Sequence, residues 1–248
     1  METRRLTAKK AFIREIVNGK YIRKPGFESN YVLTDLGRKI SRVRIIGLVV
    51  DKFVSPDEKY ATITLDDSTE TIRCKAFINT KIFDDIEKCN LVEVFGKLRE
   101  YNGEIYIIPE IIRKVDSNFE ILRLLELEEI LREQKEKIKR VSEFQKQTSD
   151  LNELKMALKN VIPWEEVEGI LEAQEMMEKK VEEKEITMNE IKNKILEMIE
   201  RLDKGEGADY QEIIEKSGFS ERDIDIAVQE LLESGICFEP KPGKIKKL

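Results

Sequence analysis

Hydrophobic side chains recur at every second position between residues 43 and 108, which is the period of β-strands. The period holds in five consecutive segments, which cover residues 43–54, 60–65, 71–77, 91–101 and 104–108. Turn-forming residues separate the segments, and Asn102-Gly103 is a strong hairpin signal between the last two. Residues 79–88, between the third and fourth segments, instead carry apolar side chains at helical spacing. This order of elements constrains the fold more than any other feature of the chain.

Three strands, a short helix and two further strands form the order of the oligonucleotide-binding (OB) barrel, a five-stranded Greek-key fold. After residue 117 the period returns to 3.6, and a helix of about 30 residues would extend roughly 45 Å, beyond the reach of a small barrel. Two more helical segments are predicted at 151–161 and 163–184. The polar run at 178–185 is interpreted as a solvated linker, and Thr187 as the start of a new helix.

The last 60 or so residues predict three helices and a terminal hairpin, the order of a winged helix. The fold class is therefore α+β and multidomain, with a five-stranded OB-fold β-barrel and a C-terminal winged-helix domain. We expect a basic N-terminal extension with a short helix from Thr7 to Asn18 (1–37), an OB-fold domain (38–116), an oligomerisation helix (117–147), a helical linker region (148–186) and a winged-helix domain (187–248).

The composition excludes many classes of enzyme. The chain has three cysteines and no histidine, which removes His-based acid–base catalysis and the common zinc sites. It also has no Gly-rich phosphate-binding motif. We therefore expect a non-enzymatic binding protein without a cofactor or metal. Because no stretch approaches the roughly 20 apolar residues of a membrane span, a cytoplasmic, nucleoid-associated protein without a membrane partner is expected.

Charge is distributed unevenly along the chain, whose formal net charge is −6. Residues 1–37 hold 8 Lys/Arg against 4 Asp/Glu, whereas residues 117–186 hold 12 against 18 and residues 187–248 hold 10 against 14. Nucleic acid is therefore expected at the N-terminal half and protein partners at the C-terminal half. Solvated surfaces are the alternative interpretation.

Alternation within the barrel places rings and cations on one outer face. The face of the second and third strands and the loop between the fourth and fifth is where OB barrels bind oligonucleotides. The residues expected there are Tyr60, Thr62, Arg73, Lys75, Phe77, Lys97, Arg99 and Tyr101. Single strands need this mixture, because bases stack on rings while cations neutralise phosphates. Alternatively, Phe77 packs beneath the following helix and Tyr101 props the hairpin. Phe53, Phe95 and Tyr106 are interpreted as core or edge residues.

Four segments resemble the middle subunit of replication protein A, in an archaeal version. They are VRIIG at 43–47, LDDST at 65–69, VEVFGKLR at 92–99 and FEIL at 119–122. The resemblance implies that Phe77 and Tyr101 stack bases and that the helix after the barrel joins helices of a large and a small subunit. This chain departs from the eukaryotic subunit in its basic N-terminus, so regulation by phosphorylation is not implied. The role of 148–186 stays open.

Two surfaces are expected to bind proteins. The residues of the assembly stripe are Ile121, Leu124, Leu127, Leu131 and Ile138, although this stripe could instead pack on the chain's own helices. The residues expected to dock proteins on the winged helix are Glu221, Asp225, Glu230 and Phe238, where acidic side chains disfavour duplex DNA. Lysines in the wing leave weak duplex contact open.

The sequence thus favours a single-stranded DNA-binding subunit of a heterotrimer that protects DNA in replication, repair and recombination. Its partners would be the large and small subunits, with replication or repair proteins at the winged helix. An assembly adaptor with a largely DNA-silent barrel is the alternative. A tRNA-binding barrel of a synthetase is a weaker one, because no adenylate-forming domain is present. The residues do not distinguish DNA from RNA.

Overall fold

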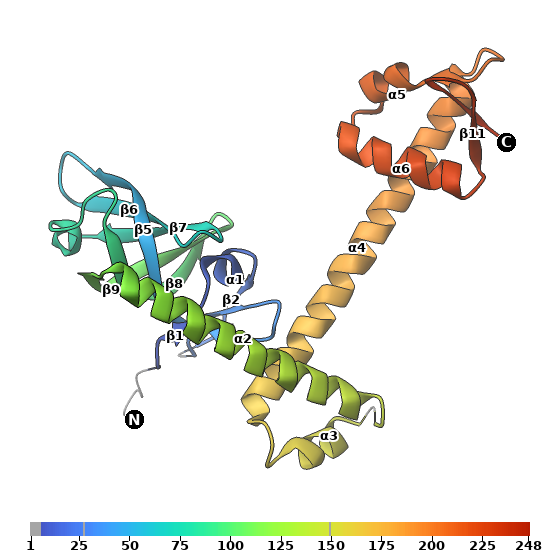
Figure 1. The fold of residues 1–248 in the computed structure, drawn as a ribbon. Helices are drawn as coiled ribbons and strands as arrows, with labels where there is room; N and C mark the ends of the chain where they lie inside the picture. The colour runs from blue at the N-terminus through green and yellow to red at the C-terminus, as the bar shows by residue number, and fades with distance from the viewer. Residues whose placement is uncertain (1–5, 27, 149) are drawn as a thin grey trace. The chain divides into compact units, whose positions relative to one another are not determined.

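The computed structural model describes residues 6–26, 28–148 and 150–248 (Figure 1). The chain divides into two compact units, residues 1–175 and residues 176–248, which are described separately below. Across the described ranges, no helix has the length and apolar character needed to cross a membrane.

The OB-like sheet contains the five predicted strands. They are β5 (Arg42–Val54), β6 (Tyr60–Asp66), β7 (Thr71–Phe77), β8 (Leu91–Tyr101) and β9 (Glu104–Lys114). Strand β9 is longer than predicted, because Pro109 lies at a register shift opposite Gly96 and interrupts the strand without ending it. A short 3-10 turn, Thr80–Phe83, replaces the longer helix expected at 79–88.

The sheet curls so that each strand meets two others. Antiparallel pairs join β5 to β6, β6 to β7, β8 to β9 and β5 to β8. Strands β7 and β9 are joined only by one parallel pair, Cys74 with Ile107. Alternate side chains of β6 and β7 fill the interior, as the sequence predicted: Ala61, Ile63, Leu65, Ile72, Cys74 and Ala76 are all buried.

The N-terminal segment packs into the same core. Its elements are β1 (Lys9–Lys10), α1 (Ile13–Val17), β2 (Lys20–Ile22), β3 (Tyr31–Leu33) and β4 (Lys39–Ile40), and β2, β3 and β4 form a small sheet. The predicted helix from Thr7 is wrong over its first turns, because residues 9–10 pair with the edge of β5. Phe12 is the N-cap, and its backbone N–H donates to the Glu15 carboxylate. Ile13, Ile16 and Val32 lie in the barrel's hydrophobic cluster.

Three helices follow the barrel: α2 (Ser117–Gln145), α3 (Leu151–Leu158) and α4 (Trp164–Leu202). Asp116 caps α2 by accepting hydrogen bonds from the N–H groups of Asn118 and Phe119. The helix start expected at Thr187 is wrong, because α4 continues through it, and the run at 178–185, expected to be a solvated linker, is helical. That run contains only Glu, Lys and Val, without Gly or Pro, so nothing in it ends a helix.

The C-terminal unit has its own core. After the end of α4 come β10 (Ala208–Asp209), α5 (Tyr210–Ser217), α6 (Glu221–Glu233), β11 (Cys237–Lys241) and β12 (Lys244–Lys247). The helices and hairpin occur in the predicted order, and β10 adds a third strand by pairing with β12. Ile195, Ile224 and Leu231 are buried between these elements. Ser220 caps α6 by accepting a hydrogen bond from the N–H of Asp223.

Candidate nucleic-acid interface

Three aromatic rings gather at one end of the outer face of β6 and β7. Tyr60 pairs directly with Phe77 across the strands, and their ring centroids lie 5.4 Å apart. Phe53 on β5 lies 6.3 Å from Tyr60, so these three residues form what we call the ring cluster. Phe77 is 51% exposed, and therefore is not packed beneath the following turn. Phe53, which was interpreted as a core or edge residue, is not in the core, since it is 50% exposed, and at this position β5 pairs with β6 but not with β8.

Ile78, beside the ring cluster, was not singled out by the sequence. It is 93% exposed and has φ = 71°, a conformation that β-branched residues rarely adopt. The turn is held in place because the N–H of Ile78 donates to the carbonyl of Lys59, and the N–H of Asn79 donates to that of Phe77. The ring cluster thus continues into a strained, exposed apolar side chain.

Tyr101 lies at the opposite end of this face. It occupies the β8–β9 hairpin and is 67% exposed. The parallel pair Cys74–Ile107 sets the first residues of β7 beside the hairpin and Phe77 at the far end. Because strands rise about 3.3 Å per residue, the six steps from Thr71 to Phe77 separate the two ends by roughly 20 Å. The outer face is therefore bounded by exposed rings at both ends.

The predicted cations lie between the rings, but most of them have carboxylate partners. Arg73 Nη1 lies 3.2 Å and Lys75 Nζ 2.7 Å from the oxygens of Glu104. Lys75 Nζ also lies 4.5 Å from the ring centroid of Tyr106, which was interpreted as a core or edge residue. Lys97 Nζ lies 3.7 Å from Glu110. The sequence analysis missed both carboxylates, although Glu104 follows the hairpin signal directly.

Thr62 and Arg99 complete the predicted set. Thr62 pairs with Lys75 in the sheet, and its buried hydroxyl has no hydrogen-bond partner among the described residues. Arg99 donates from Nη1 to the carbonyl of Leu98 and is exposed. The parts of the chain that the structure describes contain no group of three or more His, Cys, Asp or Glu side chains suited to a metal.

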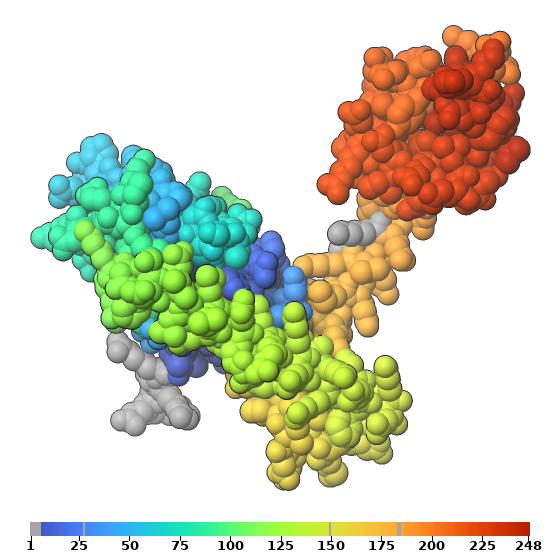
Figure 2. All heavy atoms as spheres, in the orientation of Figure 1, coloured from blue at the N-terminus to red at the C-terminus, as the bar shows by residue number. Residues whose placement is uncertain are grey.

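The predicted assembly stripe divides into a buried and an exposed part. Leu127 is buried and lines a small cavity with Ala11 and Phe12 of the N-terminal segment, whereas Ile138 packs against the cluster formed with α3 and α4. The alternative of packing on the chain's own helices therefore holds for Ile138. Leu131 is half-buried. Figure 2 shows α2 as a ridge on the first unit. Its first half exposes five apolar side chains: Phe119 and the four that we call the α2 apolar patch, which are Ile121, Leu122, Leu124 and Leu125.

A buried carboxylate fastens α2 to the sheet. Glu93 on β8 is fully buried and accepts hydrogen bonds from Arg44 Nε at 2.6 Å, Arg113 Nε at 2.8 Å and Arg123 Nη2 at 2.8 Å. Burial raises the pKa of Glu93, but the hydrogen bonds from the three arginines outweigh it, and the net pKa is lowered. Arg123 comes from α2 and also donates to the carbonyl of Arg44. The α2 apolar patch is thus held at a fixed place on the first unit.

In the C-terminal unit, the predicted docking residues differ in availability. Asp225 accepts a hydrogen bond from the Tyr210 hydroxyl, and Glu230 forms an ion pair with Lys192. Glu221 is exposed, and Phe238 is partly exposed on β11. Two of the four side chains therefore have partners within their own unit.

Comparisons with known proteins place two family domains on this chain. A model described as an OB-fold nucleic acid binding domain matches residues 43–115, and one described as replication protein A C terminal matches residues 134–240. An uncharacterized protein of Methanocaldococcus jannaschii is 29% identical over 251 aligned residues, covering 100% of this chain and 89% of that protein.

Similar solved structures include a chain of a replication protein A heterotrimer bound to single-stranded DNA, with 18% identity, a TM-score of 0.44, and coverage of 52% of this chain and 98% of that one. A chain of yeast replication protein A bound to single-stranded DNA has 23% identity, a TM-score of 0.40, and coverage of 51% and 90%. The two family matches agree with the α+β fold and with the resemblance seen in the sequence. This chain is thus similar to replication protein A: an OB-fold nucleic acid binding domain at residues 43–115 precedes a region, residues 134–240, that matches the replication protein A C terminal model.

Proposed function

We propose that this chain is the single-stranded DNA-binding subunit of a heterotrimeric, replication protein A-like complex that protects DNA during replication, repair and recombination. The observation that carries the proposal is the outer face bounded by Phe77 and Tyr101, both at least half exposed. Exposed rings are costly to leave in water, whereas a stacked base contributes about 1–3 kcal/mol of binding free energy.

The cations between the rings set how strongly this face binds. Glu104 neutralises Arg73 and Lys75 in the free protein, so a phosphate must compete with it. These ion pairs are partly exposed and therefore weak, which makes exchange for a phosphate feasible. We expect binding that depends more on stacking than on charge.

Assembly is assigned to the α2 apolar patch. Ile121, Leu122 and Leu125 are each more than half exposed on a helix whose position is fixed by Glu93. Apolar side chains gathered in this way typically mark a protein–protein contact. We propose that large and small subunits bind here, and that replication or repair proteins dock on the C-terminal unit.

The second candidate, an assembly adaptor with a DNA-silent barrel, is favoured by the carboxylates. Glu104 and Glu110 together pair with Arg42, Arg73, Lys75 and Lys97, leaving less positive charge than the sequence suggests. An adaptor would use the α2 apolar patch for assembly, and its function would not require the barrel to bind nucleic acid.

Titrating the full chain with a single-stranded and a duplex oligonucleotide, each fluorescently labelled, separates the two candidates. We expect salt-dependent binding that favours the single strand, and tighter binding for Glu104→Gln. Freeing a cation that then contacts a phosphate steepens the salt dependence by about 0.7 in log–log slope for single strands. Glu129→Gln is the matched control, because Glu129 pairs with Arg132 on α2, outside this face. No single-strand binding by either the native chain or Glu104→Gln would favour the adaptor.

A further inference from the structure

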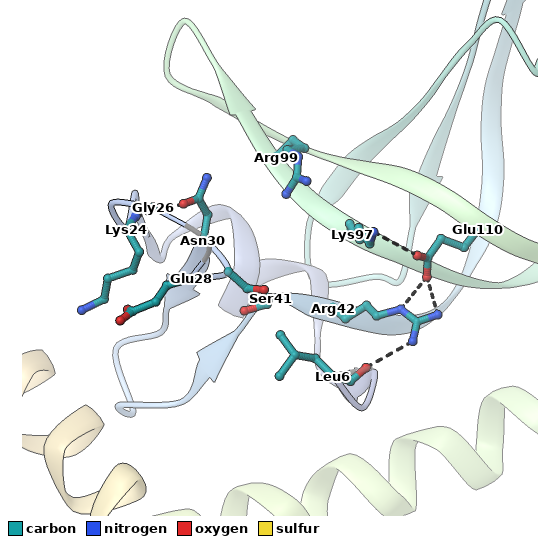
Figure 3. Close-up of a pocket in the computed structure, with 11 residues that line it drawn as sticks. Leu6, Lys24, Gly26, Glu28, Asn30, Ser41, Arg42, Lys97, Arg99 and Glu110 are labelled. Atoms are coloured by element: carbon teal, nitrogen blue, oxygen red, sulfur yellow. Dashed lines mark hydrogen bonds and ion pairs between the residues drawn. The ribbon is translucent and has the colours of Figure 1, made fainter. Parts of the chain in front are cut away.

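A polar cavity of about 440 Å³ lies beside the outer face, between the β2–β3 loop and β8 (Figure 3). The charged side chains that line it are Lys24, Glu28, Arg42, Lys97, Arg99 and Glu110. Its volume is in the range of small-molecule sites and is sufficient for a nucleotide. Four cations against two carboxylates give the lining a positive balance.

The cations are not equally engaged. Glu110 pairs with Arg42 and with Lys97. Lys24 and Arg99 have no carboxylate partner among the residues that the structure describes; Lys24 lies 5.7 Å from the centroid of the Tyr31 ring. These two side chains come from opposite walls, Lys24 from the β2–β3 loop and Arg99 from β8 (Figure 3). Neither side chain has to release a carboxylate before it contacts an anion that enters the cavity.

One wall of the cavity is formed by the antiparallel pair β2 and β3, which we call the N-terminal hairpin, and contacts with β8 hold it in place. Arg23 Nη2 lies 2.6 Å from Glu100 Oε2, and the Tyr21 hydroxyl donates to the carbonyl of Leu98 at 3.5 Å. Asn30 Oδ1 accepts from the backbone N–H of Lys24 at 2.9 Å, which fixes the loop at the position of this lysine. The cavity is therefore already formed in the free chain.

The cavity continues the outer face. Arg99 precedes Tyr101 by two residues, so both side chains point to the same side of β8. Two strand steps amount to about 7 Å. On the far side, a neighbouring cavity shares Lys24 and Arg42 but is bounded by Glu165 and Glu168 of α4. Lys9 and Lys39 also line this second cavity, so four cations stand against three carboxylates and its charge balance is less positive than that of the first.

We infer that this cavity binds a phosphate of the nucleic-acid strand that leaves Tyr101, and that the N-terminal hairpin thereby lengthens the binding path. The inference rests on the proposed function, because it assigns the next phosphate of the same strand. Lys24 is its diagnostic residue, since it comes from the hairpin and lies outside the five-stranded barrel. The group that it would bind is a phosphodiester, whose negative charge suits the positive balance of the lining.

The test uses the full chain and oligothymidylates of about 6 and about 12 nucleotides, within the range of OB-fold site sizes. Lys24→Gln is expected to weaken binding of the longer oligonucleotide about fivefold at 0.1 M salt and to lower its log–log salt slope by about 0.7. The shorter oligonucleotide, held between the rings, should bind equally well. Lys24→Arg should restore the native values, and Lys135→Gln, an exposed lysine on α2, is the control.

Equal binding of the longer oligonucleotide by the native chain and Lys24→Gln would overturn the inference while leaving the proposed function intact. Equal losses for both lengths would also overturn it, because the lysine would then act within the central face. If neither oligonucleotide bound the native chain, the proposed function itself would fail. An unchanged melting temperature for Lys24→Gln confirms that any loss is one of contact and not of folding.

Discussion

Replacing Glu93 by Gln tests whether the buried ionic cluster fastens α2 to the barrel. The substitution keeps the shape of the side chain but removes the charge that three arginines share. Breaking a buried ion pair by removing one partner costs about 3–5 kcal/mol, because the other charge stays buried. Arg123 is the partner most affected, since its side chain is 5% exposed, whereas those of Arg44 and Arg113 are 29% and 51% exposed. Glu126 Oε2, 3.1 Å from Arg123 Nε, still compensates part of its charge, which puts the expected cost at the lower end of this range.

We therefore expect Glu93→Gln to lower the free energy of unfolding of the first unit by about 3–4 kcal/mol, with most of the loss from Arg123. For a domain of this size, that corresponds to a fall in melting temperature of about 6–16 °C. Fluorescence of Trp164 is a suitable probe, because it is the chain's single tryptophan and packs against the cluster of α2, α3 and α4.

The pH dependence has a definite sign. Because the folded-state pKa of Glu93 is lowered, its contribution is fully present above the unfolded pKa of about 4.3 and is lost as the pH falls through the folded pKa. Glu93→Gln should remove this part of the acid sensitivity. Glu129→Gln, which removes an exposed ion pair with Arg132, should change the free energy of unfolding by less than about 1 kcal/mol. Similar melting of the two variants would refute the reasoning.

Three further outcomes are expected. Aspartate at both Ile121 and Leu125, which are exposed and one helical turn apart, should abolish co-purification with partner subunits and leave the melting temperature unchanged; persistent co-purification would exclude the α2 apolar patch as the contact. Ile78→Gly should raise the free energy of unfolding by about 1 kcal/mol by relieving strain at positive φ, whereas Ile78→Val should not. Equal free energies of unfolding for the two variants would argue against strain at this position. Burial and a hydrogen bond to Glu172 raise the pKa of Tyr31 to about 12. The stability that the protonated Tyr31 adds to the folded state is therefore present below pH 10 and is lost as the pH rises toward 12. An ultraviolet titration in which Glu172→Gln changes the pKa of no tyrosine would contradict this.

The sequence was most informative where the hydrophobic period determines which face of a strand is buried. Alternation in β6 and β7 correctly separated Ile72 and Cys74 from Arg73 and Phe77, because a strand with one buried face admits only one register. It could not show that Glu104 lies within reach of Arg73, since that contact depends on how β7 meets β9 across a single residue pair.

Helical segments show a similar limit. The polar run at 178–185 was interpreted as a linker because it offers no apolar face, yet lysine and glutamate are good helix formers and the helix continues. The apolar stripe of α2 could be predicted from the sequence, but its division into a buried part and an exposed part could not. Leu127 is buried in the first unit while Leu125 is exposed, and only tertiary contacts distinguish two neighbouring leucines of one helix.

The most direct test of the central claim is the affinity of the full chain for a single-stranded oligothymidylate when both bounding rings are removed. Stacking predicts that Phe77→Ala and Tyr101→Ala each cost about 1–3 kcal/mol of binding free energy, and that the losses add because the rings lie roughly 20 Å apart. Phe238→Ala, an exposed ring of the C-terminal unit, is the control. A double variant that binds as weakly as the sum of its single losses would agree with the account. Native affinity in the double variant would contradict it.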